Sequence, residues 1–256
     1  MKFSIERLRR FFLYSPALYS SVVWRPYGLL FRDPQNDACH DANHGVILDL
    51  SCDLDAALAD MEKFYRARCM APRVYGGFLP GEDALVSALK EQGYAVSFFE
   101  GEATMELLAE PSGLFPNRQA VFERPKELTM ELSALLSRNL GPWALGMEEL
   151  LLSRPDCRGY LLRTPEGQAA AYCTVLRNGD CAYLQNLFTV PEFRRQGYCA
   201  ALLTHVLSDH RTDCPGLPLY LSAVEPSAIR LYERAGFRAV PYPYPLWTAA
   251  KEGEEA

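Results

Sequence analysis

The sequence predicts a mixed α/β fold in which helices cover both faces of a sheet. One observation is the alternation of predicted strands and helices along most of the 256 residues. The other is a short segment rich in helix and strand breakers, residues 111–117, which separates two such alternating runs. We therefore predict a smaller N-terminal α/β domain over residues 1–116 and a second domain over residues 117–256.

In the first half, residues 5–31 are predicted to form an amphipathic helix followed by a docking segment. Strands are then expected at residues 45–50, 73–78, 95–100 and 103–108, and helices at residues 55–68 and 82–92. Asp53 or Asp55 would cap the first of these helices, and Gly93 would end the second. Gly101-Glu102 is predicted as the turn that joins the last two strands.

The second half continues the alternation. Strands are expected at residues 119–123, 159–163, 169–176, 181–189 and 217–224, with a last strand from residue 237, and helices at residues 127–138, 143–152, 197–210 and 226–235. The helix end at Gly236 resembles the one at Gly93, and a strand follows each of them. A weak internal repeat and an ordinary helix–glycine–strand junction explain this similarity equally well.

The composition is that of a globular protein, with 49% hydrophobic and 23% charged residues. The formal net charge of -6 argues against a non-specific nucleic-acid-binding protein. Near the N-terminus, Ser15 and Pro16 interrupt an apolar run well short of the ~18 residues that a membrane span needs. We expect a cytoplasmic monomer or homodimer with neither a nucleic-acid nor a membrane partner.

The eight cysteines are scattered and form no Cys-x-x-Cys pair, so we expect buried, reduced thiols. Cys39 and His40, with His44 four residues later, have the spacing of metal ligands. They lie in a polar loop with no obvious fourth ligand, so the sequence favours an ordinary loop over a zinc site, and no metal is predicted.

Residues 187–203 contain the features of a phosphate-binding turn. An apolar strand runs into Pro191, which cannot donate a hydrogen bond to a neighbouring strand. Arg194 and Arg195 follow, and Gly197 stands where a helix must begin. The first amides of a helix are unpaired and carry a partial positive charge, which suits a phosphate, and the arginines add charge-assisted contacts.

Arg194, Gly197 and Cys199 occupy the patterned positions of Gln/Arg-x-x-Gly-x-Gly/Ala, so this run resembles the acetyl-CoA signature of the GNAT superfamily of N-acetyltransferases. Cysteine departs from the family's glycine or alanine but is still small. Residues 228–237 resemble the family's Ala-x-x-Leu-Tyr-x-x-x-Gly-Phe helix, with Glu225 where the family often has asparagine. The resemblance covers about residues 119–247.

The resemblance implies a mainly antiparallel sheet with a splayed central strand pair, and acetyl-CoA as a cosubstrate without a metal. A small-molecule or peptide amine would attack the thioester directly in a ternary complex, and Tyr232 would protonate the leaving thiolate. The residues expected to bind acetyl-CoA are Leu187, Phe188, Thr189, Arg194, Arg195, Gln196, Gly197, Tyr198, Cys199 and Ala200.

Three matters stay open in the sequence. The strand at residues 181–189 has no carboxylate or histidine to act as a base, which leaves Glu225, Glu148 and Glu149 as candidates. A non-catalytic acyl-CoA-binding module, or an interaction module in residues 1–116, would also fit. The N-terminal half resembles a degenerate GNAT-like copy, whose turn at residues 50–55 has aspartates and neither glycine nor arginine, so we expect it to bind no CoA.

Overall fold

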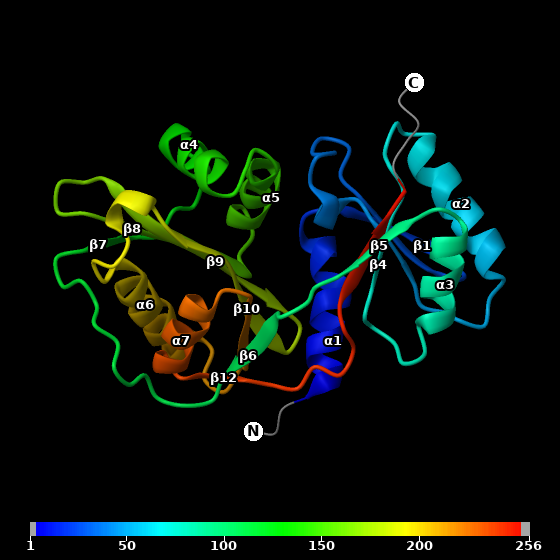
Figure 1. Ribbon diagram of the computed structural model, residues 1–256. Helices are drawn as coiled ribbons and strands as arrows, with labels where there is room; N and C mark the ends of the chain where they lie inside the picture. The colour runs from blue at the N-terminus through cyan, green and yellow to red at the C-terminus, as the bar shows by residue number, and fades with distance from the viewer. Residues whose placement is uncertain (1–3, 252–256) are drawn as a thin grey trace. The chain divides into compact units, whose positions relative to one another are not determined.

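Two β-sheets organise the chain, and each belongs to its own unit (Figure 1). The computed structural model describes residues 4–251. Of these, the major unit contains the residues up to Phe11 and Gly101–Pro241, and the minor unit contains Phe12–Glu100 and the residues from Tyr242 onward. Within the described residues, no helix is long and apolar enough to cross a membrane.

The sheet of the major unit has the strand order β12-β6-β11-β10-β9-β8-β7. Its strands are β6 (Ala103–Leu107), β7 (Val121–Glu123), β8 (Cys157–Arg163), β9 (Ala169–Asn178), β10 (Cys181–Thr189), β11 (Leu219–Ala223) and β12 (Phe237–Ala239). Neighbouring strands are antiparallel except β10 and β11, which are parallel because helix α6 (Tyr198–Asp213) returns the chain between them. The prediction of a mainly antiparallel mixed sheet is confirmed.

Helices cover both faces of this sheet, as Figure 1 shows. Helices α4 (Met130–Asn139) and α5 (Trp143–Leu152) lie on one face, and α6 and α7 (Pro226–Arg234) lie on the other. The alternation along β9 fixes the two faces. Tyr172 and Thr174 contact Glu148 of α5, whereas Cys173 between them belongs to the core cluster that contains Leu202 of α6.

The sheet of the minor unit has the strand order β1-β2-β3-β4-β13-β5. Its strands are β1 (Ser21–Arg25), β2 (Gly28–Arg32), β3 (Gly45–Ile47), β4 (Arg73–Gly76), β5 (Ala95–Phe98) and β13 (Trp247–Ala250). Helix α2 (Leu54–Arg66) connects the parallel strands β3 and β4, and α3 (Asp83–Glu91) connects β4 to β5. Asp53 caps α2 by accepting a hydrogen bond from the Ala56 amide, as one of the two predicted caps requires.

The two sheets have the same topology except for β7, which lies beyond β8 and has no counterpart in the described part of the minor unit. In each, three antiparallel strands lead into a parallel pair with a helical crossover, and a second helix leads to an edge strand. In each, a strand that is distant in sequence fills the position next to that edge strand. This strand is β6 in the major unit, between β11 and β12, and β13 in the minor unit, between β4 and β5. The similarity around Gly93 and Gly236 is therefore part of a repeat that covers a whole sheet.

This arrangement changes two expectations. The predicted Gly101-Glu102 turn does not make a hairpin, because β5 and β6 belong to different sheets. For the same reason the two units do not coincide with the predicted domains 1–116 and 117–256, since residues 101–116 belong to the major unit. The N-terminal helix α1 (Ile5–Tyr14) ends before Pro16, and the expected docking segment after it contains the β1–β2 hairpin of residues 21–32.

Strand β13 is fixed in the minor unit by Trp247, which is 2% exposed. Its ring fills the space next to Gly76, where a Cβ atom would lie 2.1 Å from the ring, so the position tolerates only glycine. The indole nitrogen donates a hydrogen bond of 2.8 Å to the buried carboxylate of Glu82. That carboxylate also accepts hydrogen bonds from the amides of Gly77, Phe78 and Leu79. Four donors thus stabilise one buried negative charge.

Candidate active site

A cavity of about 680 Å³ lies in the major unit, where the end of β10 meets the first turn of α6 and one face of α7. It is lined by Leu187, Phe188, Thr189, Phe193, Arg194, Arg195, Gly197, Tyr198, Cys199, Ala200, Ser227, Ala228, Leu231 and Tyr232. All the predicted acetyl-CoA-binding residues line it except Gln196, which is exposed and donates its side-chain amide to the Glu192 carbonyl. The predicted catalytic residue Tyr232 lines the same cavity.

The cavity is reached where β10 separates from β11. The two strands pair only at Ala182 with Leu219 and at Tyr183 with Tyr220. Beyond this point β10 contains a bulge between Gln185 and Phe188, where its register against β9 shifts. A bulge inserts one extra residue and bends the strand. The splayed central strand pair that the family resemblance implied is therefore present.

The turn between β10 and α6 contains two residues with a left-handed backbone. After the 3₁₀ turn Pro191–Phe193, Arg195 adopts a φ of 59° and Gly197 a φ of 81°. The following amides of Tyr198, Cys199 and Ala200 belong to the first turn of α6, where no partner exists within the helix.

Gly197 is required by the fold as well as by its positive φ. A Cβ atom there would lie 2.7 Å from the Phe115 carbonyl oxygen and 2.8 Å from the Asn117 nitrogen. The Asn117 amide donates to the Gly197 carbonyl at 3.1 Å, and the Asn117 side chain donates to the Gln196 carbonyl at 3.1 Å. Residues 115–117 therefore brace the turn, and the glycine gives them room.

Two arginines carry positive charge to the mouth of the cavity. Both Arg194 and Arg195 are exposed, and Nε of Arg194 donates to the Thr189 carbonyl at 3.1 Å. This hydrogen bond ties the start of the turn back to the end of β10. The lining of the cavity thus combines two exposed arginines and the start of α6 with apolar side chains from β10 and α7.

Tyr232 lies in α7 with only 6% of its surface exposed. Burial raises the pKa of its phenol well above the ordinary value, and the nearby thiols of Cys199 and Cys173 add to this effect. Burial likewise raises the pKa of the Cys199 thiol to about 11. Both groups are therefore protonated at neutral pH, so Tyr232 can donate a hydrogen bond and Cys199 is not a nucleophile.

The sequence prediction missed four residues that line the cavity: Phe193, Ser227, Ala228 and Leu231. Ala228, Leu231 and Tyr232 have the i, i+3, i+4 spacing of one helix face. That spacing is visible in the sequence and could have indicated two of the missed residues.

Of the three carboxylates left open as a base, the structure buries only Glu148. Glu149 and Glu225 are exposed, and Glu225 begins α7 without a capping hydrogen bond from its side chain. Glu148 is 0% exposed and accepts hydrogen bonds from Tyr172, Thr174 and Asn186. Burial raises the pKa of its carboxyl, and the three hydrogen bonds oppose that rise.

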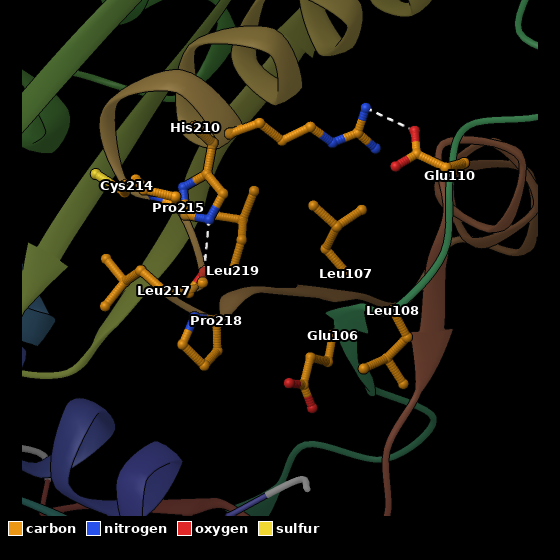
Figure 2. Close-up of a pocket in the computed structure, with 12 residues that line it drawn as sticks. Glu106, Leu107, Leu108, Glu110, His210, Cys214, Pro215, Leu217, Pro218 and Leu219 are labelled. Carbon is orange, nitrogen blue, oxygen red and sulfur yellow. Dashed lines mark hydrogen bonds and ion pairs between the residues drawn. The ribbon is translucent and has the colours of Figure 1, made fainter. Parts of the chain in front are cut away.

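A second cavity of about 540 Å³ lies elsewhere in the major unit, along β6 and the loop between α6 and β11 (Figure 2). Arg211 and Glu110 form an ion pair of 2.8 Å at its rim. Nε2 of His210 donates to the Leu217 carbonyl at 2.7 Å, as Figure 2 shows. This cavity shares no lining residue with the first one, so a substitution here can serve as a control for a substitution at the first cavity.

The corresponding turn of the minor unit, between β3 and α2, has a different chemistry. The carboxylate of Asp53 accepts the Ala56 amide at 3.0 Å, and that of Asp49 accepts the Ser51 amide at 2.9 Å. Amides that could face a phosphate are thus bonded to the chain's own carboxylates. Nearby, His40 pairs with Arg73 and His44 stacks on Tyr75. In residues 4–251 no group of three or more His, Cys, Asp or Glu could hold a metal ion.

Comparisons with known proteins agree with this geometry. Residues 128–237 match the sequence model of the acetyltransferase (GNAT) family. A GCN5-related N-acetyltransferase from Kribbella flavida has a similar structure, with a TM-score of 0.65 and 17% identity over 97% of this chain and 96% of that one. A functionally unknown protein from Staphylococcus epidermidis gives a TM-score of 0.61 at 12% identity, over 92% and 95% of the two chains.

A tandem GNAT protein from the clavulanic acid biosynthesis pathway is also similar, with a TM-score of 0.57 and 14% identity over 83% of this chain and 76% of that one. At these identities the structures show a common fold. No protein in a search of curated sequences matched. The family match spans α4 to the start of β12 and includes both segments that line the cavity. The C-terminal half of the chain therefore contains a GNAT domain, at residues 128–237.

Proposed function

We propose that the chain is an acetyl-CoA-dependent N-acetyltransferase that transfers an acetyl group to an amine. The observation that carries the proposal is the cavity at the splayed end of β10, which is lined by the turn that contains Arg194, Arg195 and Gly197, by apolar side chains of β10 and α7, and by Tyr232. An acyl-CoA has the matching chemistry, because its pyrophosphate is anionic and its pantetheine arm is long and of low charge.

The amides at the start of α6 would bind the pyrophosphate, with Arg194 and Arg195 adding charge from the rim. The exposed backbone edge of β10 beyond its bulge, at Leu187, Phe188 and Thr189, would form strand-like hydrogen bonds to the pantetheine arm. The acetyl-CoA and the amine would be held next to each other in one site, which lowers the entropic cost of the reaction. An amine would then attack the thioester carbonyl directly.

Tyr232 would serve the leaving group. When the carbon–sulfur bond breaks, the sulfur gains negative charge, and a phenol that is protonated at neutral pH donates a hydrogen bond or a proton to it. Burial makes this phenol a weaker acid, so we expect most of its effect from the hydrogen bond to the sulfur.

The acceptor class follows from the reaction alone. A small-molecule amine and a peptide amine both fit, since specificity for the acceptor depends on loops that have no common signature. Acetyl-CoA is the acetyl donor and is consumed in the reaction as a cosubstrate.

The test is release of free thiol from acetyl-CoA across a panel of small amines and amine-bearing peptides, with calorimetric titration of CoA. Arg195→Ala should weaken CoA binding about tenfold, the usual scale for one charge-assisted contact. Arg211→Ala, the same change at the second cavity, should leave it unchanged. Equal affinities for both variants would contradict the proposed site. Tight CoA binding without thiol release for any amine would instead indicate a non-catalytic binding module.

A further inference from the structure

The buried carboxylate of Glu148 is in contact with the bulge of β10. Asn186 is the residue in the bulge with a left-handed backbone, at a φ of 55°, and its side-chain amide donates a hydrogen bond to Glu148. Asparagine tolerates this conformation better than most residues, but it still needs support from its surroundings. The bulge is therefore fixed by a side chain from another element, helix α5.

Two hydroxyl groups of strand β9 also donate hydrogen bonds to the Glu148 carboxylate. The Tyr172 hydroxyl donates to its carboxylate at 2.9 Å, and the Thr174 hydroxyl donates at 2.8 Å. Both residues belong to β9, the strand against which the register of β10 shifts. The carboxylate thus links the regular strand to the bulged one at the place where their pairing is interrupted.

Glu148 lies on the buried face of α5, so its burial follows from the pattern of this helix. It shares one helix face with Ala144, Met147 and Leu151, all of which are buried, while its neighbour Glu149 is exposed. A carboxylate among apolar side chains costs free energy unless hydrogen bonds compensate for it. Here three side chains donate to it, two from β9 and one from the bulge.

We propose that Glu148 is a positioning residue that fixes the bulge of β10 through Asn186. It thereby holds Leu187, Phe188 and Thr189 in place along the cavity. The inference rests on the proposed function for its effect on turnover, but its structural part does not. Glu148 would not touch the acetyl group or the amine. It acts on the reaction only through the strand that lines the site.

The variants separate this role from that of a general base. Glu148→Leu removes the acceptor of all three hydrogen bonds. Glu148→Gln keeps an acceptor oxygen, and hydroxyls can rotate to accept from its new amide, so it should restore part of the contact. Asn186→Gly keeps access to the left-handed backbone and removes only the link to Glu148. Glu149→Gln is the matched control on the exposed side of the same helix.

Hydrogen exchange tests the structural part in the absence of any ligand. We expect exchange at residues 184–189 to rise at least tenfold in Glu148→Leu and in Asn186→Gly, about 1.4 kcal/mol of local stability, with no change in Glu149→Gln. Glu148→Gln should lie between the wild type and Glu148→Leu. Unchanged exchange at these residues in folded Asn186→Gly would overturn the proposal, whether or not the protein is an acetyltransferase.

Turnover with acetyl-CoA and an amine identified in the panel tests the second part. Glu148→Leu and Asn186→Gly should each lower kcat/KM for acetyl-CoA about tenfold and weaken CoA binding, because Leu187, Phe188 and Thr189 are no longer held along the pantetheine arm. The double variant should lose less than the product of the two. The pH profile of Glu148→Gln should keep the wild-type shape. Loss of activity in Glu148→Gln equal to that in Glu148→Leu, with full activity in Asn186→Gly, would overturn the positioning role and indicate a general base.

Discussion

The major and minor units each have a strand-to-helix junction at the same position of their shared sheet topology. The side chains at the two junctions have opposite charges. In the major unit the junction between β10 and α6 has Arg194, Arg195 and Gly197. In the minor unit the junction between β3 and α2 has Asp49 and Asp53, whose carboxylates already accept the local amides. The shared topology supplies unpaired helix amides in both units, and a few side chains at the junction decide whether the chain itself bonds to these amides.

The units also differ in how they fix the strand that is distant in sequence, β6 in the major unit and β13 in the minor unit. In the major unit Met105 of β6 is 0% exposed and lies in an apolar core cluster. In the minor unit Trp247 of β13 combines an apolar ring with a hydrogen bond to Glu82. The minor unit therefore depends on one side chain that supplies both packing and a partner for a buried charge.

The largest effect we expect comes from removing that side chain. Trp247→Ala should lower the free energy of unfolding by about 3–5 kcal/mol, because a large buried ring is lost and the Glu82 carboxylate loses one of its donors. Trp24→Ala is the control, since Trp24 is 67% exposed and its loss should cost less than about 0.5 kcal/mol. Urea unfolding of the two variants measures the difference. Similar losses for both would show that β13 is not fixed by Trp247.

The next effect concerns the site, which only the major unit has. Tyr232→Phe should lower kcat about 10²-fold, the usual scale for losing one hydrogen-bond donor to a developing negative charge, with little change in CoA affinity. Steady-state kinetics and CoA titration measure the two quantities. Wild-type turnover in Tyr232→Phe would leave the tyrosine as a packing residue against Phe237, whose ring lies 6.1 Å away.

A third effect, on pH, should appear in the minor unit. Burial lowers the pKa of His44 to about 3, so the folded protein keeps this ring neutral while the unfolded chain takes up a proton near pH 6.5. Stability contributed by the neutral ring is thus complete above pH 6.5 and is lost as the pH falls toward 3. Between pH 6.5 and 5 we expect a loss of about 2 kcal/mol.

The variant His44→Phe keeps a ring that can stack on Tyr75, whose centroid lies 4.0 Å away, and has no group to titrate. Its urea-unfolding free energy should fall about 2 kcal/mol less than that of the wild type between pH 6.5 and 5. His210 of the major unit, whose pKa burial also lowers, is present in both proteins and cancels in the comparison. Parallel pH profiles for the two proteins would contradict the assignment to His44.

The local elements could be read from the sequence, because they depend on short-range patterns. Helix α5 and strand β10 begin and end at the predicted residues, and Asp53 forms a predicted cap. The motif residues at the start of α6 and Tyr232 of α7 line one cavity. Both could be predicted from the sequence, because the first group lies in a single turn and the second on a single helix face. Strand pairing is different, because β6 and β13 pair with strands that are far away in sequence, and no local signal specifies which sheet they join.

The site could be predicted where the two family-like motifs mark it, in the turn before α6 and in α7. Gln196 lies at a variable position inside the motif and was expected to bind acetyl-CoA, but its side chain turns to the Glu192 carbonyl. Gly197 fits the motif, yet the chain at residues 115–117 needs the space that its missing side chain leaves. Glu148 stands in an apolar stripe with Ala144 and Met147, which predicts burial, but its partners on β9 and β10 become visible only in the fold.

The smallest effect should be seen at the minor unit's junction. Asp53→Ser keeps an oxygen that can accept the Ala56 amide and removes the negative charge, so stability should change by less than about 0.5 kcal/mol. Asp53→Ala removes the cap and should cost about 1 kcal/mol. Thermal unfolding of the two variants separates the cap from the charge. A large loss in Asp53→Ser would show that the charge itself supports the helix, through its dipole, more than expected.

The same pair of variants addresses whether the minor unit lacks a CoA site because of one charge or because of the whole turn. The turn at residues 50–55 has no arginine to supply a positive rim and no glycine, so removal of one carboxylate does not create a phosphate site. We therefore propose one CoA site per chain, in the major unit, and expect a titration stoichiometry near one for the wild type and for Asp53→Ser. A stoichiometry near two in Asp53→Ser alone would mean that a single aspartate keeps phosphate out, whereas two in the wild type would mean that both junctions bind it.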